Sequence, residues 1–119
     1  MSAGAPQALA AALAGALGPA APYGAPVLAG LSGFFTGSNV GSNSAAMTLQ
    51  AALGRLHGLD PALLPAVQNF TGAACAMLSA QTATVYGALA GSSPREVWRL
   101  GWPAFAVAVS LGLLAVGFT

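Results

Sequence analysis

The sequence predicts an all-α, polytopic membrane protein, and three observations carry this prediction. The chain of 119 residues is 56% hydrophobic, is only 4% charged and has a mean hydropathy of +0.75, whereas about a quarter of the residues of a soluble domain are charged. The charged residues fall into two clusters, at residues 55–60 and 95–99. They leave uncharged stretches at residues 1–54, 61–94 and 100–119, each sufficient for at least one membrane-spanning helix of about 20 residues.

Residues 1–25 are rich in Ala and Pro, and we expect them to hold the end of a helix and a linker. Residues 7–17 contain only Ala, Leu, Gly and Gln, which are compatible with a helix. Pro19, Pro22 and Pro26 follow at short intervals and stop that helix, because proline lacks the N–H that a helix interior needs. A helix of about 12 residues is too short to cross a bilayer alone.

Residues 26–54 are predicted to form a re-entrant helical hairpin, in which two half-length helices enter and leave the membrane on one side. Small and polar residues at 36–43 separate two apolar arms, residues 26–36 and 44–54. At about 1.5 Å per residue each arm reaches roughly 16 Å, about half of the hydrocarbon core. Non-helical backbone at that depth is tolerated only inside protein or beside a wet cavity, so we expect the tip to be a binding site.

One alternative for this region is a single uninterrupted transmembrane helix. Gly33, Gly37 and Gly41 recur every four residues, a spacing that suits close packing against a neighbouring helix. The Gly, Ser and Asn residues clustered at 37–43 argue against it, since they have poor helix propensity and favour turns and N-caps.

Residues 55–60 are expected to form an outer loop, and residues 61–90 a discontinuous transmembrane helix. Gln68, Asn69 and Thr71 interrupt the apolar character of that stretch, and Thr71 is the predicted N-cap of its second half. The alternative is one long, tilted helix in which Gln68 and Asn69 bond to neighbouring helices.

Residues 91–99 are predicted to form a cytoplasmic loop, because they hold two of the three arginines and positive residues favour the cytoplasmic side. Residues 100–119 are the predicted last transmembrane helix, with Trp98 and Trp102 as anchors at the membrane interface. In this topology the hairpin opens toward the outside.

The two predicted breaks bring the N-termini of two half-helices to a common point, one near Ser42 and Asn43 and the other near Thr71 and Gly72. Unpaired backbone N–H groups and the positive end of the helix dipole favour an anion there without a basic side chain, and a carboxylate is the simplest one. The carbonyl end of the first arm, near Thr36, could hold a cation. The candidate substrate-binding residues are Thr36, Gly37, Ser38, Asn39, Ser42, Asn43, Gln68, Asn69 and Thr71.

Several classes of function are excluded by what the sequence lacks. A net charge of +1 gives no basic face for nucleic acid, and no nucleophile–base pair, paired carboxylates or phosphate loop indicates an enzyme. No cofactor or metal site is expected, because Cys75 is the single cysteine and reads as a small buried thiol. His57, Asp60 and Glu96 lie in predicted loops, so no titratable group at membrane depth carries protons.

Several segments together resemble the C-terminal part of the L-lactate permease family. They are residues 26–43 (with Thr36-Gly37-Ser38-Asn39), Leu49-Gln50-Ala51, Gln68-Asn69 and Met77-Leu78-Ser79. The resemblance covers roughly residues 24–100 and implies transport of L-lactate or glycolate with protons, by a multi-pass protein of the bacterial inner (plasma) membrane. More distantly, a hairpin followed by a broken helix is similar to the second repeat of divalent-anion symporters, whose Ser-Asn-Thr hairpin tips bind ion and substrate carboxylate.

The sequence departs from that family in two respects. Members run to several hundred residues, so this chain is expected to be a C-terminal fragment of an inverted-repeat transporter that works with an N-terminal repeat or as a homo-oligomer in the lipid bilayer. Members often carry a Lys before the Met-Leu-Ser step, where this sequence has Ala76. Two alternatives stay open: a small membrane structural or assembly subunit that packs through Gly33, Gly37 and Gly41, and a non-functional truncated permease.

Overall fold

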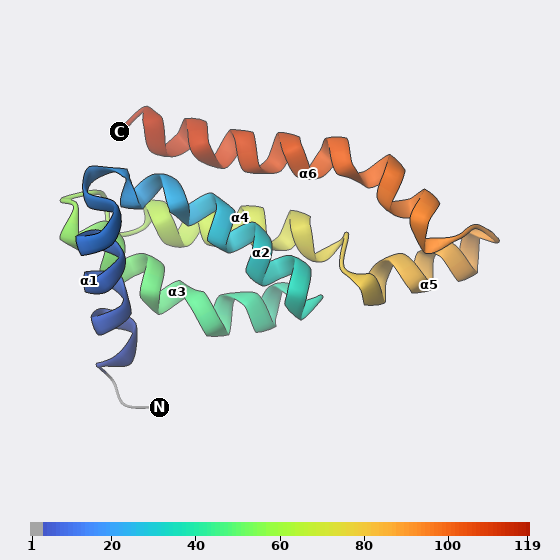
Figure 1. Cartoon of the computed structure of the whole chain (residues 1–119), viewed down its shortest axis with the longest axis horizontal. Helices are drawn as coiled ribbons and strands as arrows, with labels where there is room; N and C mark the ends of the chain where they lie inside the picture. Colours follow the sequence, from blue (N-terminus) through green and yellow to red (C-terminus); the bar gives the residue numbers. More distant parts are fainter. Residues whose placement is uncertain (1–3) are drawn as a thin grey trace.

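The computed structural model describes residues 4–119, and all regular structure in this part of the chain is helical (Figure 1), which confirms the all-α prediction. The molecule is elongated, with a longest dimension of 48 Å. In chain order the elements are α1 (Ala5–Leu17), the 3-10 helix η1 (Gly18–Gly24), α2 (Ala25–Thr36), α3 (Asn39–Leu56), α4 (Leu63–Ala76), α5 (Ala80–Ala90) and α6 (Pro94–Gly117).

Helix α1 lies across one end of the bundle formed by the other helices (Figure 1). It ends at Leu17, as the prolines that follow predict. Gly18 then takes a positive φ of +54°, which glycine adopts without the penalty that a side chain brings. The 3-10 helix η1 changes the direction of the chain, and α2 then runs along the long axis of the molecule.

Helices α2 and α3 run antiparallel and form a helical hairpin (Figure 1). Only Gly37 and Ser38 join them: Gly37 ends α2 with a φ of +63°, and Ser38 Oγ caps α3 by accepting the N–H of Gly41 at 3.2 Å. The alternative of one uninterrupted helix is therefore wrong.

The hairpin tip is shorter than predicted. Residues 39–43 were expected in the tip, with the second arm starting at residue 44 and a helix N-terminus near Ser42 and Asn43, but they form the first turns of α3. Because Ser38 alone satisfies the N-cap, the small polar residues after it need not act as caps and are accommodated in the helix.

The predicted break within residues 61–90 occurs, but eight residues further along the chain. Helix α4 runs without interruption through Gln68 and Thr71, so the predicted N-cap at Thr71 is wrong. The chain breaks after Ala76, and Ser79 Oγ caps α5 by accepting the N–H of Thr82 at 3.2 Å. The alternative of one unbroken tilted helix over this stretch is wrong for the same reason.

Helix α6 begins at Pro94, six residues before the predicted start at residue 100, so the expected loop at 91–99 is reduced to residues 91–93. The cause is a capping box: Ser93 Oγ accepts the N–H of Glu96, and Glu96 Oε2 accepts the N–H of Ser93 at 2.9 Å. The helix then runs back along α5, α4 and α2 (Figure 1).

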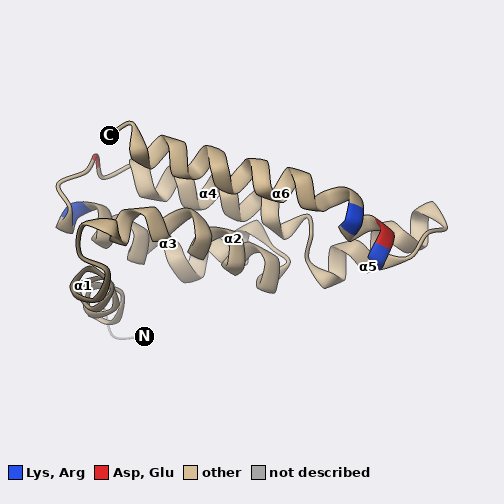
Figure 2. Ribbon diagram, turned by 45° about the horizontal axis from the view of Figure 1, so that its top comes forward, with Lys and Arg blue, Asp and Glu red and all other residues tan. Residues whose placement is uncertain are grey.

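In the described part of the chain, two segments are long and apolar enough to cross a membrane, Ala5–Thr36 and Pro94–Gly117. The first contains the bend at η1 and the second is α6. Charged residues are confined to the last turn of α3, the loop that follows it and the start of α6, and Figure 2 shows these blue and red segments toward opposite ends of the molecule.

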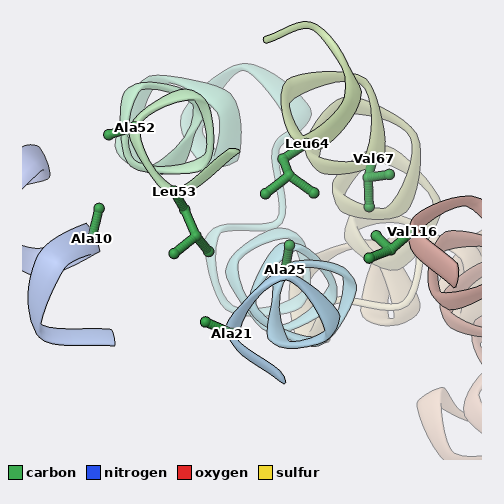
Figure 3. Close-up of a cluster of buried hydrophobic side chains, with 8 residues drawn as sticks. All are labelled: Ala10, Ala21, Ala25, Ala52, Leu53, Leu64, Val67 and Val116. Atoms are coloured by element: carbon green, nitrogen blue, oxygen red, sulfur yellow. The ribbon is translucent and has the colours of Figure 1, made fainter. Parts of the chain in front are cut away.

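The apolar core lies at the open end of the hairpin, and half of its buried members are alanine, which lets the helix backbones approach closely. Figure 3 shows Leu53 and Leu64 pointing into it from α3 and α4. Its buried members are Ala10, Ala21, Ala25, Ala52, Leu53, Leu64, Val67 and Val116.

Candidate functional site

A buried cluster of polar side chains joins both arms of the hairpin to α4. Gln68 is fully buried, and its Nε2 donates to Ser42 Oγ at 2.8 Å and to Ser32 Oγ at 3.2 Å. The two serine hydroxyl oxygens lie 2.5 Å apart. Gly72 leaves the room they need, since a Cβ there would lie 2.9 Å from Ser42 Oγ. One amide of α4 thus bonds a serine of each arm of the hairpin.

Gln50 extends this cluster toward the open end of the hairpin. Its Nε2 donates to Gln68 Oε1 at 3.2 Å and to the Ala25 carbonyl at 3.3 Å. Gln50 Oε1 is buried and has no partner. Sequence reasoning assigned no role to Gln50 or Ser32, although Gln50 follows Ser42 by eight residues, a spacing that places both on one helix face.

Three asparagines form a second group on the outer side of the same interface. Asn39 Nδ2 and Asn43 Nδ2 both donate to Asn69 Oδ1, at 3.0 Å and 2.7 Å. Asn39 and Asn43 are half-buried and their side-chain oxygens have no partner, whereas Asn69 is exposed. The structure therefore brings together three predicted site residues and leaves the buried side-chain oxygens of Asn39 and Asn43 without a partner.

The hairpin tip touches the start of α5. A Cβ on Gly37 would lie 3.0 Å from Ser79 Oγ and 2.9 Å from Gln81 Oε1, so the backbone at the tip contacts both side chains. This contact places Ser79, the N-cap of α5, beside Gly37, the residue that precedes the N-cap of α3, Ser38. The predicted pair of helix N-termini near Ser42 and Thr71 is not formed, because both residues lie inside helices.

In the sequence analysis, Ser79 was named only within the segment Met77-Leu78-Ser79, and Gln81 was not singled out. The signal that could have located this N-terminus was Ser79 three residues before Thr82, a local N-cap pattern. Thr71 offered an equally good pattern, so the sequence did not distinguish them.

Thr71 lies apart from the other predicted residues, on the side of α4 that faces α6. It is fully buried, its hydroxyl has no partner, and a Cβ on Gly112 would lie 3.0 Å from its Oγ1. The nine predicted residues thus divide by place: the tip holds Thr36, Gly37 and Ser38, the outer group Asn39, Asn43 and Asn69, the buried cluster Ser42 and Gln68, and the α6 side Thr71.

The single histidine lies at the open end of the hairpin, far along the chain from the tip residues. His57 Nδ1 is 3.0 Å from the Leu53 carbonyl and Nε2 is 3.1 Å from the Gly18 carbonyl. Within residues 4–119, no three His, Cys, Asp or Glu side chains gather in a way that could hold a metal ion. The polar groups at the tip are therefore uncharged amides, hydroxyls and backbone.

The family model described as L-lactate permease matches residues 1–100. No curated protein and no solved structure matches the chain. The family match confirms the resemblance seen in the sequence; it implies a membrane protein that transports lactate rather than an enzyme. On this match over most of its length, the chain belongs to the L-lactate permease family.

Proposed function

We propose that this chain supplies part of the L-lactate site of a proton-coupled permease, at the junction of the hairpin tip with α5. The observation that carries the proposal is the contact of Gly37 with Ser79 and Gln81. It joins the N-termini of α3 (18 residues) and α5 (11 residues), whose unpaired N–H groups and dipoles favour a carboxylate. No basic side chain is needed for such a site.

The length of the first arm, α2, supports a re-entrant placement of the hairpin in the membrane, whereas the second arm, α3, has 18 residues and reaches about 27 Å. Helix α6 has 24 residues and reaches about 36 Å, enough to cross the hydrocarbon core, whereas the 12 residues of α2 reach about 18 Å. A hairpin of that length, packed alongside α6, ends inside the bilayer. With the start of α6 in the cytoplasm, as the arginine count favours, the hairpin opens outward in a bacterial inner membrane.

The outer asparagine group is the surface that we assign to the rest of the lactate molecule. Asn39 and Asn43 offer unpartnered side-chain oxygens, and Asn69 is exposed. The Nδ2 of exposed Asn69 can donate to the lactate carboxylate beside the helix N-termini, and the two unpartnered amide oxygens can accept from the lactate hydroxyl. We propose that Ser42 and Gln68 hold α3 and α4 together beside the site. We also propose that Thr36, at the carbonyl end of α2, lies next to the position of the coupling proton.

An exposed amide at membrane depth needs a partner, because an unsatisfied polar group in hydrocarbon costs several kcal/mol. The exposure of Asn69 therefore supports the proposal that a further protein surface completes the site. That surface comes from an N-terminal repeat or from a second copy of the chain. The alternative of an assembly subunit packing through a glycine stripe is less well supported, since Gly33 is already packed against Gly72 within the chain.

The test is uptake of labelled L-lactate into vesicles with an inward proton gradient. Vesicles contain this chain alone or with a co-expressed N-terminal portion of a lactate permease, as wild type, Asn39→Ala or Ser110→Ala, the last an exposed control on α6. We expect uptake that requires both parts, depends on the gradient, falls in Asn39→Ala and persists in Ser110→Ala. Absence of uptake in every correctly folded combination would contradict the proposal.

A further inference from the structure

An apolar groove runs between α5 and α6, away from the asparagine group. Its volume is about 610 Å³, and its apolar lining includes Met77, Leu78, Tyr86, Val97 and Leu100. The floor is formed where the chain breaks between α4 and α5: Leu78 packs on Gly101, and Trp98 Nε1 donates to the Leu78 carbonyl at 2.9 Å. The groove is therefore a fixed feature of the packing of α6 on the break.

Charged side chains of both signs border this groove. Arg99 and Glu96 line it, and Arg95 precedes Arg99 by four residues, a spacing that places both arginines on one face of α6. The Glu96 carboxylate keeps its charge, but its Oε2 is held at the helix cap, where it accepts hydrogen bonds from Ser93 N at 2.9 Å and Ser93 Oγ at 3.2 Å. Arg99 is therefore the group in the lining that can pair with an anion.

We propose that the groove binds an acyl chain of an anionic phospholipid whose phosphate pairs with Arg99. An apolar channel with a guanidinium at its edge matches a lipid, which carries a long apolar chain next to a phosphate, and guanidinium binds phosphate with two parallel hydrogen bonds. Trp98 and Trp102 flank Arg99, as aromatic residues do at the headgroup level. The proposal rests on the membrane location of the chain and not on the lactate site.

Of the two tryptophans of the chain, Trp98 packs at the floor of the groove, where its Nε1 donates to the Leu78 carbonyl, and its fluorescence reports on the groove. The chain is reconstituted in phosphatidylcholine vesicles that contain increasing fractions of phosphatidylglycerol with brominated acyl chains, which quench tryptophan fluorescence on contact. Brominated phosphatidylcholine serves as the neutral comparison. We expect phosphatidylglycerol to be preferred about fivefold, the fold-change that corresponds to about 1 kcal/mol for one arginine near an anionic surface.

Three variants separate a site from general charge attraction. Arg99→Gln removes the proposed phosphate partner and is expected to abolish the preference, whereas Arg55→Gln, at the opposite end of the molecule, keeps it. Ala90→Phe fills the groove and is expected to reduce quenching by both lipids without changing charge. Equal quenching by the two lipids, equal effects of the two arginine variants, or no quenching because protein covers the groove would each overturn the proposal.

Discussion

Gly33 of α2 packs directly against the backbone of Gly72 of α4, so closely that a Cβ on Gly33 would overlap the Gly72 carbonyl. This contact sets the distance between the first arm of the hairpin and the broken helix. Small residues at such crossings are how membrane helices gain packing energy without a hydrophobic driving force between them.

Gly33→Ala is expected to destabilise the protein, by about 1–3 kcal/mol, because the added methyl group has no space and overpacking forces the backbones apart. Unfolding in mixed micelles of increasing denaturing detergent measures the effect. Gly15→Ala is the matched control, since a Cβ at Gly15 in α1 meets nothing within 4 Å and alanine favours a helix. Equal stability of the two variants would contradict the close contact.

Gly37→Ala is expected to weaken lactate binding while leaving the assembly of the protein intact. Gly37 has a φ of +63°, and a Cβ would press on Ser79 and Gln81 at the start of α5. Gly58→Ala carries the same backbone strain, at a φ of +66°, but a Cβ there meets nothing within 4 Å. Backbone strain of about 1–2 kcal/mol is expected in both variants, but only Gly37→Ala disturbs the contact with α5. Lactate binding and size-exclusion chromatography of both variants therefore distinguish the effect of strain from the effect of the contact.

Loss of association in Gly37→Ala, with no dependence on substrate, would instead favour the structural-subunit alternative. Equal lactate binding by Gly37→Ala and Gly58→Ala would show that the tip contact has no part in the site.

Gln68→Leu is expected to destabilise the protein by about 1–2 kcal/mol, the upper range for polar contacts between membrane helices. Leucine has a similar volume but leaves Ser42 and Gln50 without their shared partner, and unpaired buried groups are costly. Gln7→Leu, at an exposed position in α1, makes the same chemical change without that loss. A thermal unfolding midpoint that falls equally in both variants would argue against the buried cluster.

Cys75 is expected to resist a membrane-permeant maleimide in the folded protein and to react only after denaturation. The thiol is fully buried in α4, next to Gly30 of α2. A Cys75→Ser, Thr84→Cys double variant supplies an exposed thiol on α5 as the positive control. Rapid labelling of folded wild-type protein would show that the hairpin opens from α4 on the timescale of the reaction.

Helix ends that are set by residues nearby in the sequence could be predicted from the sequence. Helix ends that depend on contacts with other helices could not. The prolines after Leu17 correctly predict the end of α1. The polar residues Gln68 and Thr71 look like a helix break in isolation, but their side chains turn toward other helices, Gln68 to Ser42 and Thr71 to Gly112. Nothing local to α4 reveals those partners.

The start of α6 was predictable in principle. Ser93-Pro94-Arg95-Glu96 is a capping box with proline at the first helical position, but the charged residues there suggested a loop. Charge places a segment near water without deciding whether it is helical. For the candidate site, composition predicted the amide and hydroxyl groups, whereas their division between a buried cluster and an outer group depends on which face of α3 meets α4.

His57 connects two elements that are distant in the sequence, because its ring nitrogens face the Leu53 carbonyl of α3 and the Gly18 carbonyl that follows α1. These contacts link α1, which lies across the end of the bundle, to the open end of the hairpin. A displacement of the hairpin relative to α6 carries α1 with it, so a spectroscopic label on the exposed side of α1 can report movement at a tip that the label never touches.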